Sequence, residues 1–194
     1  MPRTLFLGHS FFSRLQMALE CVFSAFGPVV LARGGALLDS FDSDLNDLSQ
    51  LVPGKIFICL LDNEIFTSNG WRRHRNLYVI LQRLRILVLR LKSQFPMAQI
   101  YVDLCHCRLE PGSGQTVFQE QYMNLAHHLN NMVLDMSYEM GFYVFGSRMT
   151  IWPETKVRNT KKRVNASLFL PDGIHPSESG MIELLASIQS NMVD

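Results

Sequence analysis

Residues 4–10 read Thr-Leu-Phe-Leu-Gly-His-Ser, a brief apolar run closed by a glycine. Apolar residues then recur at helical spacing across Phe11–Phe26, which predicts a helix that ends before Gly27-Pro28. A short apolar strand that passes directly into a helix is the repeating unit of an α/β fold with a parallel sheet. Residues 4–26 therefore predict one strand–helix unit of such a fold.

The same alternation of strand and helix continues to the C-terminus. The further strands are predicted at Val29–Ala32, Lys55–Leu61, Gln99–Leu104 and Phe142–Phe145. The further helices are predicted at Asp39–Leu51, Trp71–Phe95, Val117–Met140 and Glu178–Met192. Near-continuous apolar strands are expected where helices cover both faces of a sheet. The pattern therefore predicts one domain over residues 1–194, a three-layer α/β/α sandwich with a five-stranded parallel sheet of flavodoxin-like order 2-1-3-4-5.

Composition narrows the class of protein. Of the 194 residues, 47% are hydrophobic and 18% are charged, which argues against intrinsic disorder. The net charge of +1 excludes a uniformly basic nucleic-acid binder. The four cysteines are too few and too scattered for a disulfide framework. With no apolar span and no signal peptide in the sequence, we expect an intracellular, cytoplasmic protein.

Polar residues of a particular kind follow the strands. Ser10 follows the first strand, Gly35 the second and Asn63 the third, and Asp172 and His175 precede the last helix. Ligands of such folds bind outside the carboxyl ends of the strands, so we expect these residues to converge. Taken alone, Ser10 also fits a helix N-cap.

This set of groups suits acyl transfer. A serine hydroxyl needs a base to become a nucleophile, and His175 oriented by Asp172 could serve as that base. The backbone N–H groups of Ser10 and Gly35 and the Asn63 carboxamide could stabilise the oxyanion of a tetrahedral intermediate. This chemistry requires neither a cofactor nor a metal.

The chain resembles the SGNH hydrolases, also called GDSL-like esterases. The resemblance rests on Gly8-His9-Ser10, Gly35, Asn63 and the run Asp172-Gly173-Ile174-His175-Pro176. It implies the flavodoxin-like sandwich, a nucleophilic Ser10, an Asp172–His175 pair and an oxyanion hole at Ser10, Gly35 and Asn63. It also implies a serine esterase that acts on short acyl esters, with acetyl esters or lipid-derived esters as the expected substrates.

Two positions depart from the pattern of that family. His9 stands where the family has aspartate, and Leu61 stands where it has glycine. The sequence favours a solvent-facing loop position for His9 over a second polar group at the site. These departures leave an alternative open. The chain could be a non-catalytic binding module with the same fold, which docks to a membrane or to RNA through its basic segments.

A narrower resemblance involves the esterase domains in first-open-reading-frame proteins of some vertebrate long interspersed retrotransposons. It is carried by Gly-His-Ser-Phe at 8–11, Arg-Gly-Gly-Ala at 33–36 and Asp-Gly-Ile-His-Pro-Ser at 172–177. It implies a longer parent chain with self-association or RNA-binding segments.

Charge is segregated along the chain. No acidic residue occurs from Ile65 to Val102, a stretch with seven basic residues, namely Arg72, Arg73, Arg75, Arg83, Arg85, Arg90 and Lys92. A second basic cluster spans 156–163, and aspartates crowd the segment 39–47. The basic segments could solvate the surface or dock on an anionic membrane, whereas RNA binding is less favoured because few aromatic residues are interleaved. The leucine-rich spacing from Leu77 to Leu91 indicates a core-facing helix rather than a coiled coil.

His106 is a further candidate for the site. Cys105-His106-Cys107 does not have the spacing of common zinc ligands, although His106 follows a strand and could edge the pocket.

Overall fold

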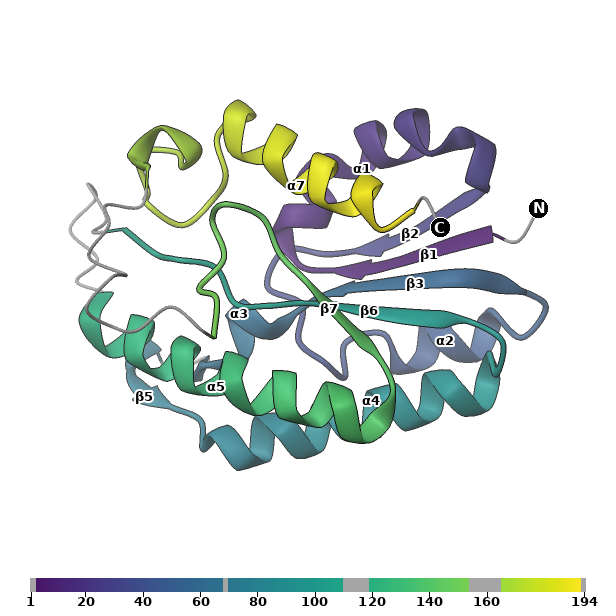
Figure 1. The fold of residues 1–194 in the computed structure, drawn as a ribbon, viewed down its shortest axis with the longest axis horizontal. Coiled ribbons are helices and arrows are strands. Elements are labelled where there is room, and N and C mark those ends of the chain that lie inside the picture. Colours follow the sequence, from purple (N-terminus) through teal and green to yellow (C-terminus); the bar gives the residue numbers. More distant parts are fainter. Residues whose placement is uncertain (1–2, 68–69, 110–118, 154–164, 193–194) are drawn as a thin grey trace.

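The structure is a computed structural model, and it describes residues 3–67, 70–109, 119–153 and 165–192. Its centre is a five-stranded sheet of order β2-β1-β3-β6-β7 (Figure 1). The strands are β1 Arg3–Gly8, β2 Pro28–Ala32, β3 Pro53–Cys59, β6 Gln99–Asp103 and β7 Tyr143–Phe145. Every neighbouring pair in this sheet is parallel. The predicted strand order 2-1-3-4-5 is confirmed.

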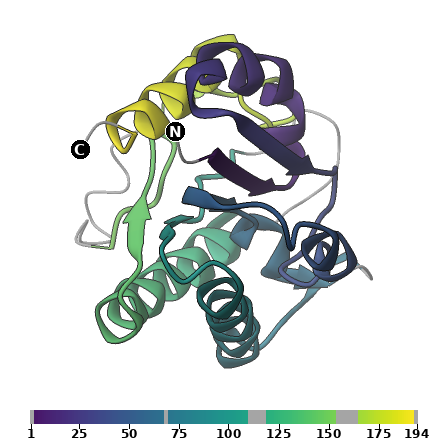
Figure 2. The same ribbon diagram turned by 90° about the vertical axis from the view of Figure 1, so that its right-hand side faces the viewer.

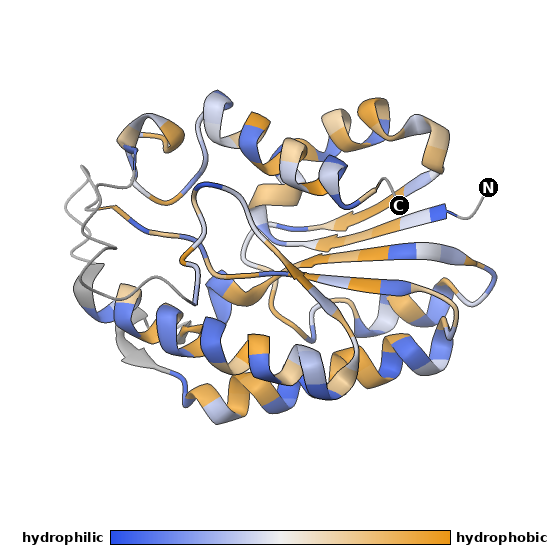
Figure 3. Cartoon of the chain, in the orientation of Figure 1, coloured by the Kyte–Doolittle hydropathy of each residue, from blue (hydrophilic) through white to orange (hydrophobic). Residues whose placement is uncertain are grey.

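Helices cover both faces of the sheet, which confirms the predicted three-layer sandwich. The elements are α1 Ser10–Val22 and α7 Glu178–Ser190 on one face, and α2 Asp42–Asp47, α4 Leu77–Gln94 and α5 Gln119–Met140 on the other. Figure 2, an end view, separates the two helical layers. The central parts of the inner strands are hydrophobic, with hydrophilic residues nearer the strand ends (Figure 3), and the side chains of Leu5, Phe6 and Leu7 are fully buried. The described helices include none long and apolar enough to cross a membrane.

Several predicted boundaries were wrong: the helix predicted at Asp39–Leu51, for example, spans only Asp42–Asp47, and two other differences change the local structure. The helix predicted to begin at Trp71 begins at Leu77, where the Asn76 side chain caps it by accepting a hydrogen bond from the Tyr78 N–H at 2.9 Å. The residues before it form β5 Gly70–His74, which pairs antiparallel with β4 Phe66–Thr67. As predicted, the leucine stripe of α4 is its core face, with Leu81, Leu84, Val88 and Leu91 buried.

The second boundary lies beside the site. The third strand was predicted to extend to Leu61, but β3 ends at Cys59 and Leu61 begins the short helix α3 Leu61–Glu64. α3 therefore carries Asn63 directly outside the carboxyl end of β3.

Gly8 determines how closely helix α1 can follow strand β1. A Cβ atom at residue 8 would lie 2.5 Å from the side chain of Phe12. Only glycine allows this close approach, because any side chain would displace the first turn of α1. This packing places Ser10 at the first residue of the helix.

The acidic and basic segments that are separated in sequence pair with each other in the fold. Arg83 lies 2.6 Å from Asp39, Arg90 pairs with Asp42, and Arg85 pairs with Glu139 at 2.8 Å. The described arginines of α4 thus have carboxylate partners. The second basic cluster lies outside the described residues.

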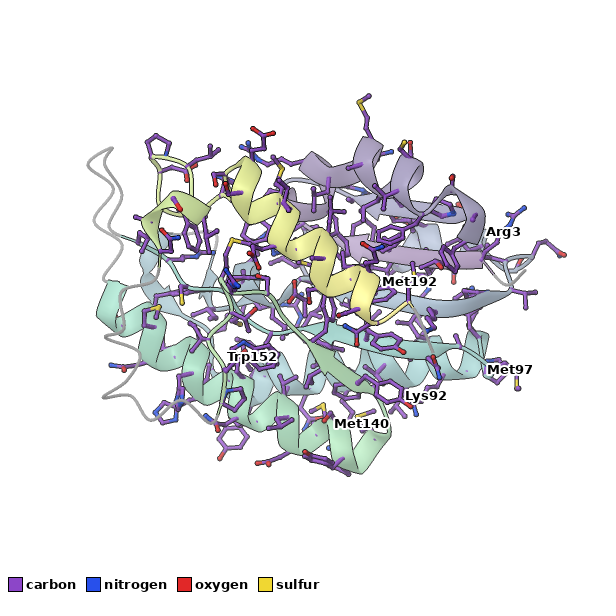
Figure 4. The ribbon with its side chains drawn as sticks, turned by 45° about the horizontal axis from the view of Figure 1, so that its top comes forward. Arg3, Lys92, Met97, Met140, Trp152 and Met192 are labelled. Atoms are coloured by element: carbon purple, nitrogen blue, oxygen red, sulfur yellow. The ribbon has the colours of Figure 1, made fainter. Side chains whose placement is uncertain are left out.

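Lys92, the last basic residue of α4, contacts the residue that follows α5. Its Nζ donates to the Gly141 carbonyl at 3.1 Å, and Figure 4 shows Lys92 beside Met140 at the end of α5. This contact joins the C-terminal ends of α4 and α5.

Glu64, the last residue of α3, forms a buried ion cluster. Its fully buried carboxylate accepts from Arg75 at 2.6 Å, from Arg83 at 2.5 Å and from the Leu38 N–H at 2.7 Å. These bonds tie α3 to the loop after β2, the loop that carries Gly35. Glu64 therefore fixes two of the predicted oxyanion-hole segments relative to each other.

We predict that Glu64→Ala lowers the free energy of unfolding by about 3 kcal/mol, because two mostly buried guanidinium groups lose their shared partner. The control Glu139→Ala removes an exposed carboxylate and should change stability little. Urea unfolding of both variants measures this, and equal losses would contradict the structural role of Glu64.

Candidate active site

The ends of the strands meet at one pocket. The cavity has a volume of about 270 Å³ and is lined by four of the predicted residues, Ser10, Gly35, Asn63 and His175. Its other lining residues come from the same segments and from the loop after β6, namely His9, Phe11, Gly34, Asp62, Cys107, Arg108 and Ile174. The structure therefore brings together groups that are up to 165 positions apart (175 minus 10) in the sequence.

Ser10 is the first residue of α1 but not its cap. The N-cap is His9, whose Nδ1 accepts the Phe11 N–H at 3.3 Å. The interpretation of Ser10 as an N-cap is thus wrong, and its hydroxyl is free of that role. The Ser10 N–H, unlike the Phe11 N–H, is not used by this cap, and at the start of a helix it has no carbonyl partner within the helix, so it is available to an oxyanion.

Gly35 and Asn63 lie on neighbouring loops. Gly35 has φ +74°, in the left-handed region, and a Cβ atom there would meet nothing within 4 Å. Backbone conformation rather than space therefore favours glycine at this position. The Asn63 carboxamide donates to the Ala36 carbonyl at 3.2 Å, which holds Asn63 beside the Gly35 loop.

His175 and Asp172 form a directly bonded pair. His175 Nδ1 lies 2.7 Å from Asp172 Oδ2, and Asp172 Oδ1 accepts the backbone N–H groups of Ile174 and His175 at 2.9 Å each. Partial burial raises the pKa of Asp172, but these hydrogen bonds outweigh it and hold the pKa below its ordinary value. A charged Asp172 keeps the proton on Nδ1 of His175 and leaves Nε2 as the basic atom.

The turn between these two residues is fixed by packing. Gly173 has φ +67°, and a Cβ atom there would lie 2.8 Å from the Leu109 carbonyl oxygen. The Gly173 carbonyl in turn accepts the Leu109 N–H at 2.8 Å. The Asp172–His175 segment is thereby anchored to the loop after β6.

Ser10 and His175, both among the described residues, line the same pocket without a direct hydrogen bond between them. Ser10 Oγ lies 3.5 Å from His9 Nδ1 instead. Catalytic hydrogen bonds are often long or unformed before substrate binds, so this arrangement is compatible with a Ser10–His175 proton transfer.

His9 is buried, with 1% of its surface exposed, so the prediction of a solvent-facing loop residue was wrong. Its Nε2 lies 3.3 Å from Asp62 Oδ2, and its Nδ1 is the acceptor that caps α1. Burial lowers the pKa of His9 despite the nearby Asp62 carboxylate. His9 is therefore a neutral imidazole with its proton on Nε2.

Asp62 is the centre of a buried polar network that sequence reasoning missed. Its Oδ2 lies 3.0 Å from His106 Nδ1, and its Oδ1 accepts the His106 N–H at 2.8 Å and the Tyr122 hydroxyl at 2.9 Å. Burial raises the pKa of Asp62, but His106 and His9 hold it well below its ordinary value. The carboxylate is thus charged although it is buried. In the sequence, the only indication of this role is that Asp62 follows the third strand closely.

His106 lies between two buried carboxylates. Its Nδ1 faces Asp62, and its Nε2 lies 3.4 Å from Asp103 Oδ2. Burial disfavours the imidazolium, yet Asp103 and Asp62 raise the pKa of His106 to about 9. Burial raises the pKa of Asp103 to about 7.

One set of side chains in this network could in principle hold a metal ion. Donor atoms of His9, Cys59 and Asp62 lie within 4.8 Å of one another, and all three residues are buried. Burial and the nearby Asp103 carboxylate raise the pKa of Cys59 well above its ordinary value, so a metal ion would have to displace the thiol proton to bind here. Asp62 Oδ2 is already shared by two imidazoles. In this arrangement the set works as a hydrogen-bond network.

Known proteins resemble this chain in fold but not in sequence. No protein-family model matches the sequence, and no curated protein matches it either. Solved structures do match in fold. A GDSL-like lipase from Bacteroides thetaiotaomicron has a TM-score of 0.74 at 15% identity, over 98% of this chain and 87% of that one.

Two further structures match over nearly their whole length. A proposed SGNH hydrolase from Slackia heliotrinireducens has a TM-score of 0.70 at 15% identity, over 98% of each chain. An acetylxylan esterase from Geobacillus stearothermophilus has a TM-score of 0.63 at 16% identity, over 100% of this chain and 94% of that one. The chain therefore has the α/β fold of the SGNH hydrolases.

We predict that the stability of the protein falls between pH 6.5 and 9. The pKa of His106 is about 9 in the folded protein and has its ordinary value of 6.5 in the unfolded chain. Protonated His106 therefore stabilises the fold in full below pH 6.5, and this stabilisation is lost as the pH rises through about 9. The change should be on the order of 1–3 kcal/mol.

Chemical denaturation at pH 6.5, 8 and 9.5 measures this slope. Asp103→Asn removes the largest cause of the raised His106 pKa at nearly constant side-chain volume. The free energy of unfolding of this variant should therefore fall less steeply with pH than that of the wild type. An unchanged slope in this variant would contradict the assignment.

Proposed function

We propose that the protein is a serine carboxylic-ester hydrolase that cleaves short acyl esters, acetyl esters first among them. The observation that carries the proposal is that Ser10, Gly35, Asn63 and the Asp172-bonded His175 line one pocket. The fold shared with lipases and acetylxylan esterases supports the same reaction class.

The reaction would proceed through an acyl-enzyme. His175 Nε2 accepts the proton of Ser10 Oγ as the oxygen attacks the ester carbonyl, and Asp172 stabilises the imidazolium. The imidazolium then gives its proton to the leaving alcohol. Water, activated in turn by His175, attacks the acyl-Ser10 ester and releases the carboxylic acid.

The oxyanion of each tetrahedral intermediate would be bound by three donors. These are the backbone N–H groups of Ser10 and Gly35 and the Asn63 carboxamide, which come from the loops after β1, β2 and β3. Donors fixed in advance stabilise the developing charge without reorganisation of the site. The Glu64 cluster and the bond from Asn63 to Ala36 supply that rigidity.

The pocket favours a small acyl group. Its volume of about 270 Å³ must hold the reacting ester, and Phe11, Cys107 and Ile174 form part of its wall. The narrower resemblance to retrotransposon esterase domains would place the same activity within a longer chain.

The second candidate is a binding module that has lost catalysis. It is favoured by two observations, namely His9 in place of the aspartate of the family and the contact of Ser10 Oγ with His9 rather than His175. The two candidates differ in whether Ser10 is nucleophilic.

We predict that Ser10→Ala lowers kcat/KM for 4-nitrophenyl acetate at least about a thousandfold, because the nucleophile is lost. Thermal unfolding should be nearly unchanged, since the Ser10 side chain caps no helix. Steady-state kinetics measures the effect, and substantial residual turnover would refute Ser10 as the nucleophile.

We predict a smaller loss for the oxyanion hole. Asn63→Ala should lower kcat by about 100- to 1,000-fold, the usual effect of deleting one donor. Comparison of kcat with KM checks this, because an effect confined to KM would mean that Asn63 only binds substrate.

Covalent labelling separates the enzyme from the binding module. A fluorophosphonate probe should label Ser10 in the wild type and fail with His175→Ala, which lacks the base. Peptide mapping locates the label, and a wild-type protein that stays unlabelled would favour the binding module.

A further inference from the structure

We propose that Arg108 binds an anionic group of the substrate, so that the preferred ester carries a carboxylate or phosphate near its scissile bond. This inference rests on the proposed ester hydrolysis at Ser10 and adds a substrate class to it. Arg108 lines the same pocket as Ser10 and His175.

The Arg108 guanidinium is held in place from two sides. It lies over the ring of Tyr122, 4.4 Å from the centroid, and its NH2 donates to the Asp62 carbonyl at 3.0 Å. Tyr122 is itself fixed, because its hydroxyl donates to the buried Asp62 carboxylate. An arginine held in this way can bind an anion with little further loss of side-chain freedom.

The carboxylates of Asp62 and Asp172 have other partners and form no ion pair with Arg108. Asp62 directs its carboxylate oxygens to His9, His106 and Tyr122 and offers Arg108 only its backbone carbonyl. The carboxylate of Asp172 is bonded to His175 and to backbone N–H groups. Among the described residues, Arg108 makes no salt bridge, in contrast to Arg75, Arg83 and Arg85.

A guanidinium has five N–H donors, and only one of those of Arg108 has a hydrogen-bond acceptor within the described part of the chain. The planar fork of such a group matches the oxygens of a carboxylate or a phosphate. Arg108 is also only half-buried, so a ligand in the pocket can reach it. Its position therefore fits a charged substituent of the ester better than a purely structural role.

The test compares two substrates that differ only in charge. We use 4-acetoxybenzoate and its neutral isostere 4-acetoxybenzamide, with each rate divided by the rate of hydroxide-catalysed hydrolysis. Wild-type enzyme should favour the benzoate about tenfold or more in kcat/KM, mainly through a lower KM. This preference should vanish in Arg108→Gln, persist in part in Arg108→Lys and be unchanged in Arg148→Gln, which removes an exposed arginine.

The outcomes separate the two proposals. If the wild type hydrolyses both esters without preference, the role of Arg108 is wrong while the esterase stands, and this result needs no variant to fold. If Arg108→Gln loses turnover of both esters equally, Arg108 has a structural or oxyanion role and the proposal is also overturned. If neither ester is hydrolysed, the proposed function fails.

Binding can be measured apart from catalysis. Calorimetry with the Ser10→Ala protein should show tighter binding of 4-acetoxybenzoate than of the benzamide, and equal binding would overturn the role of Arg108. A third ligand, 4-acetoxyphenyl phosphate, distinguishes the two anions, since tighter binding than the benzoate would assign phosphate as the preferred group.

Discussion

The buried carboxylate of Asp62 is the constraint on which the candidate site depends. It lies just after β3 and joins His9 from the end of β1, His106 from the end of β6 and Tyr122 from α5. A charge removed from water costs several kcal/mol unless it is fully hydrogen-bonded, and here four donors from three other segments meet that requirement. Separating any of these segments would leave the charge with too few partners. The network therefore holds three loops in one arrangement.

That arrangement accounts for the departure of His9 from the family pattern. The imidazole bonds to Asp62 through Nε2 and caps α1 through Nδ1, so the loop before Ser10 is supported without an aspartate at position 9. The support comes from Asp62, the residue next to Asn63, so the segment that carries Ser10 is coupled to the segment that carries Asn63. Tyr122 extends the same network to Arg108 at the pocket wall. The proposed nucleophile, oxyanion hole and anion site thus share one buried framework.

Much of the fold could be predicted from the sequence, because parallel strands that helices cover on both faces form near-continuous apolar runs. The strand order and the convergence of Ser10, Gly35, Asn63 and His175 followed from that pattern. The start of α4 was missed because the apolar and basic residues before Asn76 also suit a helix, while the hairpin of β4 and β5 depends on pairing between strands. The burial of His9 was missed for a related reason, since its partners lie 53 and 50 positions away at Asp62 and Cys59.

The central claim is that Ser10 attacks an ester carbonyl within this framework. Its most direct test is to mix the enzyme with 4-nitrophenyl acetate, quench within the first turnover and digest the protein for mass spectrometry. The account predicts an added acetyl group on the peptide that contains Ser10, absent when His175 is replaced by alanine. An enzyme that releases 4-nitrophenol with no acetyl group on that peptide, or with the group on another residue, would contradict it.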